Sequence, residues 1–148
     1  MGEVNLVTVL NETIQLIANQ AKVQKIQIKL ALQKTIILVS GVSGLLQQVF
    51  MNIFLNAINA MPNGGVLSIT VNMIEDRVIV RIADNGVGIP AGELDKIFDP
   101  FHTSSPVGQG TGLGLSICYS IIRQHLGSIQ AESRLGQGAT IIVTLPLL

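Results

Sequence analysis

Residues 110–115 read Gly-Thr-Gly-Leu-Gly-Leu and lead into an amphipathic segment that we expect to be a helix over 113–125. With Gly108, the glycines recur at every second position. Backbone N–H groups at the start of a helix bind phosphate oxygens without a lysine, and the helix dipole assists them. The run lacks the Gly-Lys-Ser/Thr of a Walker A loop and the last glycine of a dinucleotide fingerprint. It therefore predicts a phosphate-binding loop of another kind.

Upstream of this run, Asp84 follows an alternating segment and opens a loop that reads Asp-Asn-Gly-Val-Gly-Ile-Pro. Gly86 and Gly88 let the backbone turn sharply and approach a ligand closely. A carboxylate accepts hydrogen bonds, so Asp84 can receive the exocyclic amine of adenine, whereas guanine presents a carbonyl oxygen there. Because Asp-Asn-Gly is also ordinary turn material, this loop alone leaves both an adenine site and a plain turn open.

Further upstream, apolar residues with helical spacing predict a helix over 43–61. One side of it carries amides, since Gln48, Asn52 and Asn56 are spaced by four and Asn59 follows three residues later. A solvated helix face normally carries Glu, Lys or Arg, and each Asn is poorer by roughly half a kcal/mol in helix propensity. The amide oxygen is a neutral hard ligand, suited to Mg²⁺ that phosphates already partner. The stripe predicts either such a metal site or a polar surface.

The rest of the chain predicts further helices and strands. Helices are expected over 4–21 and 91–97, strands over 26–32 and 36–39, hairpins over 66–74 with 77–83 and over 128–133 with 139–146, and a mobile lid over 99–111. Gly127 is expected to cap the helix before it. Because helices are few and strands mostly sequential, we predict a single domain over residues 1–148. It should be an α/β two-layer sandwich, with a mixed, mostly antiparallel sheet and helices on one face.

The composition limits the classes of function. The 148 residues are 48% hydrophobic, which suits one domain with a substantial core. Nine basic and nine acidic residues balance, and one tyrosine and four phenylalanines are the only aromatics, so a nucleic-acid surface is not expected. The aliphatic runs are too short to cross a bilayer. Cys118 is the only cysteine, which excludes an internal disulfide and indicates a reduced, cytoplasmic setting.

In this order, the segments resemble the ATP-binding catalytic domain of sensor histidine kinases. That family is related to gyrase B, the 90-kilodalton heat-shock chaperones and the mismatch-repair ATPases. Four segments correspond in turn to its asparagine, first glycine, phenylalanine and second glycine boxes: residues 48–57, 84–90, 98–103 and 110–115. Four boxes in order, within a match from about residue 4 to Pro146, are far more specific than any one of them. Residues 60–65, Ala-Met-Pro-Asn-Gly-Gly, further resemble the subgroup of nitrogen-regulation kinases.

The resemblance implies a Bergerat-type ATP-binding fold, ATP and Mg²⁺ as cofactors, and roles for individual residues. Asn56 would ligate Mg²⁺, Asn52 would support it in catalysis, and Asn59 would lie beside the nucleotide. Asp84 would bind the adenine amine. The other implied nucleotide-binding residues come from the first glycine box, the lid and the glycine run: Gly86, Gly88, Ile89, Phe98, Phe101, Thr103, Gly110, Thr111, Gly112, Leu113, Gly114 and Leu115.

One substitution separates branches of this group. Hydrolytic relatives carry a glutamate four residues before the metal-binding asparagine, where it activates water. Here that position is Asn52, and an amide cannot act as a general base. The resemblance therefore implies the kinase branch, in which a histidine on a separate dimerisation and phosphoacceptor domain attacks the γ-phosphate of ATP, in signalling to a response regulator. Positioning and charge stabilisation would then supply the catalysis.

The two histidines are not in a phosphoacceptor context, and His102 and His125 are each expected to be solvated or to cap a helix. We therefore expect the acceptor domain to lie elsewhere in a longer parent protein. The sequence leaves open whether that parent is membrane-anchored. We expect the domain over residues 1–148 to be monomeric. Residues 103–105, Thr-Ser-Ser, replace the Thr-Thr-Lys frequent in this subgroup, which removes one phosphate contact.

Two other hypotheses remain open from sequence. An anti-sigma-type serine kinase uses the same ATP-binding fold, and the acid stability of the phosphorylated product separates the two kinases. A degenerate nucleotide-sensing interaction module is the third hypothesis, motivated by Ser105 in place of the lysine. ATP binding without any transfer would favour it.

Overall fold

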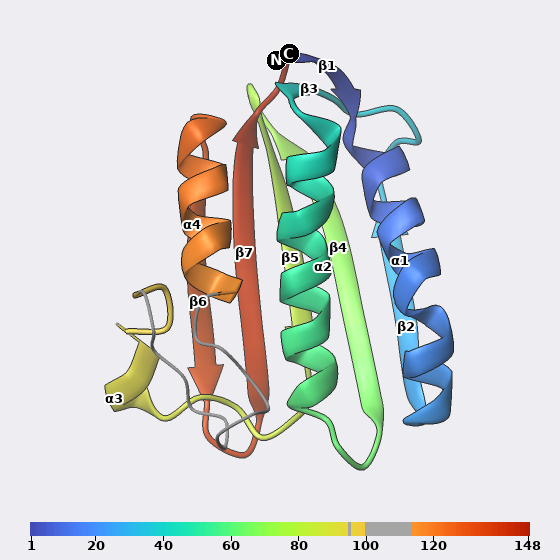
Figure 1. Cartoon of the computed structure of the whole chain (residues 1–148), viewed down its shortest axis with the longest axis vertical. Coiled ribbons are helices and arrows are strands. Elements are labelled where there is room, and N and C mark those ends of the chain that lie inside the picture. Colours follow the sequence, from blue (N-terminus) through green and yellow to red (C-terminus); the bar gives the residue numbers. More distant parts are fainter. Residues whose placement is uncertain (95, 100–113) are drawn as a thin grey trace.

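A computed structural model describes residues 1–94, 96–99 and 114–148, and in these ranges three helices lie on one face of a five-stranded sheet (Figure 1). The elements, in chain order, are β1 (Gly2–Asn5), α1 (Leu6–Val23), β2 (Ile26–Leu32), β3 (Leu38–Gly41), α2 (Ser43–Asn59), β4 (Gly65–Ile74), β5 (Arg77–Asp84), α3 (Ala91–Leu94), α4 (Gly114–Gln124), β6 (Ser128–Arg134) and β7 (Gly138–Pro146). The covering helices are α1, α2 and α4. The two-layer α/β sandwich with helices on one face is confirmed.

The main sheet has the strand order β2-β4-β5-β7-β6. Strand β4 pairs antiparallel with β5, β5 with β7, and β7 with β6, whereas β2 pairs parallel with β4. The parallel pair follows from connectivity, because the chain leaves β2 and returns to β4 through β3 and the crossover helix α2. The sheet is mixed and mostly antiparallel, as predicted.

The core lies between the sheet and the three helices. Alternate residues of β4 and β5 point into it, and Leu67, Ile69 and Val80 are almost fully buried. Phe50 and Phe54 fill the space beneath α2, with their ring centroids 6.2 Å apart. Each such side chain stabilises the fold by about 1.5–3 kcal/mol through removal from water. This core fixes α2, which carries Asn52, Asn56 and Asn59, and β5, which ends at Asp84.

At the N-terminus the structure adds a strand that the sequence pattern did not predict. Strand β1 pairs antiparallel with β3 in a separate two-stranded sheet, and β3 begins two residues later than the predicted strand at 36. Helix α1 begins at Leu6 rather than Val4 because Asn5 caps it: Asn5 Oδ1 accepts hydrogen bonds from the N–H groups of Val7 and Ile37, each at 3.1 Å.

Two further predictions need correction. Helix α3 ends at Leu94, shorter than the predicted 91–97. At the end of α4, the left-handed residue is Leu126, with φ 62°, and not the predicted Gly127. Gly127 donates its N–H to the carbonyl of Ile122 at 2.9 Å, which completes the helix end. A Cβ on Gly127 would lie 2.2 Å from the carbonyl oxygen of Thr144, so close packing on β7 requires glycine there.

In the described parts of the chain, no helix combines the length and apolarity needed to span a bilayer.

Candidate functional site

Helix α2 carries the predicted amides along its less buried side. Asn52 is half-buried, and Asn56 and Asn59 are exposed, whereas Phe54 on the opposite side is buried. A spacing of four places Asn52, Asn56 and Ala60 along one side of the helix. At one end of this row, Asn52 Nδ2 donates a hydrogen bond to the carbonyl oxygen of Gly114 at 3.3 Å.

At the other end of the row, the carbonyl oxygen of Ala60 accepts a hydrogen bond from the N–H of Val87 at 3.0 Å. Val87 belongs to the loop over 84–90 that follows β5, which we call the carboxylate loop. The exposed amide of Asn56 is thus one helical turn from each contact. It lies between the first residue of α4 and the carboxylate loop, two segments far apart in sequence that α2 brings to one side of the fold.

Asp84 is the last residue of β5, and its side chain is half-buried. Its Oδ1 accepts hydrogen bonds from the N–H groups of Gly86 at 2.9 Å and Ala139 at 3.3 Å. Burial raises the pKa of the Asp84 carboxyl above its ordinary value of 3.8, and the two backbone hydrogen bonds oppose that rise. Both bonds use the same oxygen, so a ligand donor would use Oδ2.

The glycines of the carboxylate loop are needed for two different reasons. A Cβ on Gly86 would lie 2.1 Å from the carbonyl oxygen of Ala60, so the loop can pack on the end of α2 only with glycine there. Gly88 has φ 75°, the left-handed conformation that glycine adopts without strain. The following residue, Ile89, packs with its side chain against the core. The predicted sharp turn of this loop is confirmed.

The buried Cys118 of α4 contacts the side chain of Asn52. Its Sγ donates to the carbonyl oxygen of Val49 at 3.4 Å. Burial raises the pKa of the Cys118 thiol to about 12, although a hydrogen bond with the Asn52 side chain acts in the opposite direction. A thiol with such a pKa stays protonated at neutral pH and is not a nucleophile. Cys118 and Gly114 together fix the Asn52 amide toward α4.

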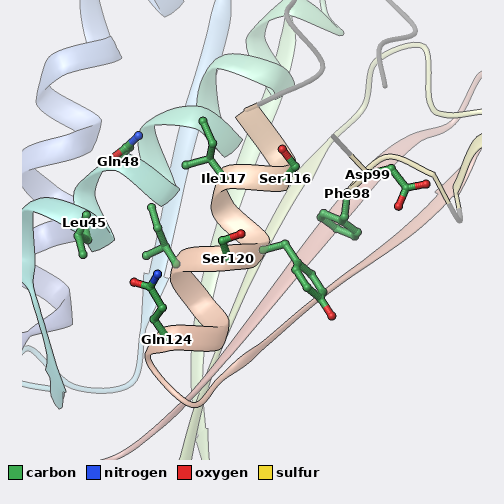
Figure 2. A pocket seen from close by; sticks show the side chains of 10 residues that line it. Leu45, Gln48, Phe98, Asp99, Ser116, Ile117, Ser120 and Gln124 are labelled. Carbon is green, nitrogen blue, oxygen red and sulfur yellow. The ribbon is translucent and has the colours of Figure 1, made fainter. Parts of the chain in front are cut away.

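Phe98 lies beside α4. Its ring packs on Tyr119, with centroids 6.2 Å apart and an interplanar angle of 35°. Both border a groove of about 760 Å³ that runs along α4 beside the start of α2 (Figure 2), lined by Leu45, Gln48, Phe98, Asp99, Ser116, Ile117, Tyr119, Ser120, Ile121 and Gln124. Of the predicted site residues, Phe98 lines this groove, whereas Asn56 and Asp84 do not.

Some predicted residues cannot be placed. Phe101, Thr103, Gly110, Thr111, Gly112 and Leu113 lie outside the described residues. Gly114 and Leu115 are the first residues of α4, and Leu115 packs partly buried against the core.

Among residues 1–94, 96–99 and 114–148, no group of three or more His, Cys, Asp or Glu side chains could hold a metal ion. The exposed amides of Asn56 and Asn59 offer neutral oxygen donors. Such donors suit Mg²⁺ when anionic ligands such as phosphates accompany it. The donor set therefore fits a nucleotide-bound Mg²⁺ better than a metal held by the protein alone.

Comparison with known proteins decides the family. Residues 41–148 match the model of the family described as histidine kinase-, DNA gyrase B- and HSP90-like ATPase. The chain belongs to this ATPase family. It is 37% identical over 144 residues to the sensor histidine kinase ZraS of Escherichia coli K12, an overlap that covers 97% of this chain and 30% of ZraS. It is 36% identical over 146 residues to sporulation kinase E of Bacillus subtilis, covering 98% of this chain and 20% of that protein.

Solved structures place this ATPase-family member among histidine kinase catalytic domains. The catalytic domain of histidine kinase ThkA is 33% identical, with a TM-score of 0.87 over 97% of this chain and 93% of that one. ThkA has also been solved in complex with the response regulator TrrA. The chain spans only 20–31% of the length of its first curated relatives. The resemblance to histidine kinase catalytic domains, carried by the four boxes and by Asn52, is confirmed, and the nitrogen-regulation subgroup stays a prediction.

Sequence reasoning missed three residues that the structure places around the site. Ala60 and Ser133 contact the carboxylate loop through hydrogen bonds, and Cys118 contacts Asn52. Each contact joins residues more than 25 positions apart, and only the fold brings them together. Gly136 and Gly138, which follow Ser133 by three and five residues, were the one sequence signal that another segment packs closely on this hairpin.

Proposed function

We propose that this domain binds Mg²⁺–ATP and presents the γ-phosphate to a histidine on a separate phosphoacceptor domain. The observation that supports it is the amide row of α2. It meets the start of α4 at Asn52 and the carboxylate loop at Ala60, with the free face of Asn56 between them. Three chemically different groups, an amide, a carboxylate and a helix start, therefore border one exposed region.

In this proposal each group recognises one part of the nucleotide. Oδ2 of Asp84 accepts the exocyclic amine of adenine, while Gly86, Gly88 and Ile89 let the purine approach the backbone. Asn56 is a ligand to Mg²⁺, with Asn59 close by. Mg²⁺ would neutralise the charge on the β- and γ-phosphates. The glycine run and lid, including the residues outside the described ranges, would bind the phosphates, as their sequence predicts.

Asn52 has a different part in the proposal. Its amide is held by Gly114 and Cys118, and an amide cannot take a proton from water. The site therefore positions ATP for an external nucleophile rather than activating water. We propose that the nucleophile is a phosphoacceptor histidine and that the parent protein signals to a response regulator, as the ThkA–TrrA complex exemplifies for ThkA. We also propose a cytoplasmic setting, consistent with the free, buried Cys118.

Calorimetry tests the binding half of this proposal. Titration with ADP and with a non-hydrolysable ATP analogue should show binding that strengthens when Mg²⁺ is present, and GDP should bind more weakly. No heat at millimolar ADP would contradict the proposed site.

A transfer assay tests the catalytic half. The domain should pass labelled phosphate from ATP to the phosphoacceptor domain of a histidine kinase relative, and the label should be lost in acid. An acid-stable product would favour a serine kinase instead. Nucleotide binding without transfer to any acceptor tried would favour a nucleotide-sensing module.

A further inference from the structure

The turn between β6 and β7, residues 135–137, packs directly on the carboxylate loop. Gly138 has φ 95°, and a Cβ there would lie 2.1 Å from the carbonyl oxygen of Asp84 and 2.9 Å from Cα of Asn85. Any larger residue at 138 would push the two segments apart. The backbone of β7 therefore lies against the residue proposed to read adenine.

Ser133, the penultimate residue of β6, links the carboxylate loop to the start of β7 through one hydroxyl. Its Oγ accepts a hydrogen bond from the N–H of Ile89 at 2.6 Å and donates one to the carbonyl oxygen of Gly138 at 3.0 Å. Two more bonds cross the same interface. The N–H of Gly136 donates to the carbonyl oxygen of Val87 at 2.7 Å, and the N–H of Ala139 donates to Asp84 Oδ1.

On its other side, the carboxylate loop is held by two hydrogen bonds: the carbonyl oxygen of Ala60 accepts from the N–H of Val87, and Asn85 Oδ1 accepts from the N–H of Val66 at 2.9 Å. Neither of these bonds involves the Asp84 side chain. The contacts from β6 and β7 instead reach the carboxylate itself and the far end of the loop at Ile89. The orientation of the carboxylate thus depends on how closely the loop and the β6–β7 turn approach each other.

We propose that Ser133 is a positioning residue of the nucleotide site, whose hydroxyl clamps the carboxylate loop to the β6–β7 hairpin and thereby orients Asp84 toward adenine. The inference rests on the proposed function and adds a residue that lies in none of the four sequence boxes. Without the hydroxyl, the N–H of Ile89 and the carbonyl of Gly138 both lose a partner. The loop would then move away from β7, and the 3.3 Å bond from Ala139 to Asp84, the longest in the set, would break first.

Four variants test this clamp. Ser133→Ala removes the hydroxyl, and Ser133→Thr keeps it. Ser133→Val has the size of threonine without the hydroxyl, so the Thr and Val variants decide the question if the Ala variant fails to fold. Ser128→Ala is the matched control, because Ser128 lies at the opposite end of the same strand.

Two measurements separate the effect of a variant on the packing of the loop from its effect on nucleotide binding. Hydrogen exchange of a peptide over 85–90, measured without ligand, reports the clamp alone, and calorimetric Kd values for ADP and GDP report the site. In the Ala and Val variants we expect faster exchange in this peptide and about tenfold weaker ADP binding, the scale of one lost buried hydrogen bond. GDP binding should change less, so the preference for ADP shrinks. The Thr variant and the Ser128 control should match the wild type.

Unchanged exchange in the Ala and Val variants would overturn the clamp, whether or not the protein binds ADP. Faster exchange with an unchanged ADP Kd and unchanged preference over GDP would overturn the positioning role. Failure of the wild type to bind ADP would instead contradict the proposed function, and the exchange data would still decide whether Ser133 holds the loop.

Discussion

At the scale of single residues, Asp84 is where folding and ligand binding have opposite requirements. The carboxyl is half-buried, and its hydrogen bonds come from neutral N–H groups rather than from a cation. Burial therefore disfavours its charged form, and its pKa is raised. A ligand that donates to the free oxygen would offset that desolvation. We therefore expect Asp84 to contribute to ligand binding rather than to the stability of the free protein.

The Asp84→Asn variant should separate these two requirements. Its Oδ1 can still accept from Gly86 and Ala139, but its Nδ2 would face the adenine amine as a second donor. We expect ADP binding to weaken by at least about tenfold, while the free energy of unfolding at pH 7 stays equal or rises. Calorimetry and urea unfolding measure the two quantities. Asp76→Asn, at an exposed position in the β4–β5 turn, is the control and should change neither.

The stability difference between Asp84→Asn and the wild type should also depend on pH. Because the folded-state pKa of Asp84 lies above its unfolded value of 3.8, the native state binds more protons between the two values. Asp84 therefore lowers wild-type stability as pH rises through this window. The stability advantage of Asp84→Asn should be present at pH 7 and disappear as pH falls toward 3.8. An advantage that grows on acidification would contradict the assigned burial.

Asn56→Ala tests the metal ligand. Asn56 is exposed on α2, so alanine should leave the fold intact and raise helix stability by about half a kcal/mol. We expect the strengthening of ADP binding by Mg²⁺ to be lost, while the affinity for ADP without Mg²⁺ is unchanged. Asn19→Ala, an exposed asparagine of α1, gives the same helix gain without the metal effect. If Mg²⁺ still strengthens binding to the Asn56 variant, another group coordinates the metal.

At the scale of elements, the N-terminus of α2 is supported by His125, the residue that follows α4. Its N-cap residue, Val42, has no side-chain oxygen to offer. Instead, the N–H of Val42 donates to His125 Nε2 at 3.1 Å, and the histidine Nδ1 pairs with the carbonyl of Ile121 at 2.7 Å. Since Nε2 accepts, Nδ1 carries the proton. His125 is only 3% exposed, so the expected solvated role is wrong, and the expected capping role is confirmed.

Removing this histidine should loosen the start of α2. In His125→Ala, the N–H of Val42 loses its partner and a cavity opens beside Gly41, whose missing Cβ makes room for the ring. We expect the free energy of unfolding to fall by about 1–3 kcal/mol, measured by urea denaturation. Gln124→Ala, at the neighbouring exposed position, should change it by less than about 0.5 kcal/mol. Equal stabilities of the two variants would show that His125 does not support α2.

The sequence pattern predicted those elements whose buried residues recur at the regular spacing of a strand or a helix. In the β4–β5 hairpin, buried residues alternate with half-buried or exposed ones, and the apolar stripe of α2 has helical spacing, so both were predicted to within two residues. Strand β1 was missed because four residues that read Gly-Glu-Val-Asn carry no such alternation, and pairing with β3 alone defines them. The site divides in the same way, since Asp84 and Asn56 stand in recognisable motifs, whereas Ser133 and His125 act through contacts 44 and 83 residues away.

At the scale of the whole molecule, the folding unit is larger than the segment that defines the family. The family match begins at residue 41, yet the core extends into the preceding segment. Leu6, Leu10 and Ile17 of α1 are almost completely buried, and β2 supplies the parallel neighbour of β4. The nucleotide site depends on this part indirectly, because α1 packs on α2, the helix that carries the amide row.

A fragment of residues 41–148 should therefore fail to fold cooperatively, although it contains all four sequence boxes. Loss of α1 uncovers the apolar side of α2, and loss of β2 leaves β4 as an exposed, largely apolar edge that invites aggregation. Urea unfolding followed by circular dichroism should show a broad transition or none, and ADP should give no calorimetric heat. Removal of Met1 alone is the control and should leave a single sharp transition. A fragment that unfolds cooperatively and binds ADP would show that α1 and β2 are an accessory layer, and the amide row would then be fixed by α4 and the sheet alone.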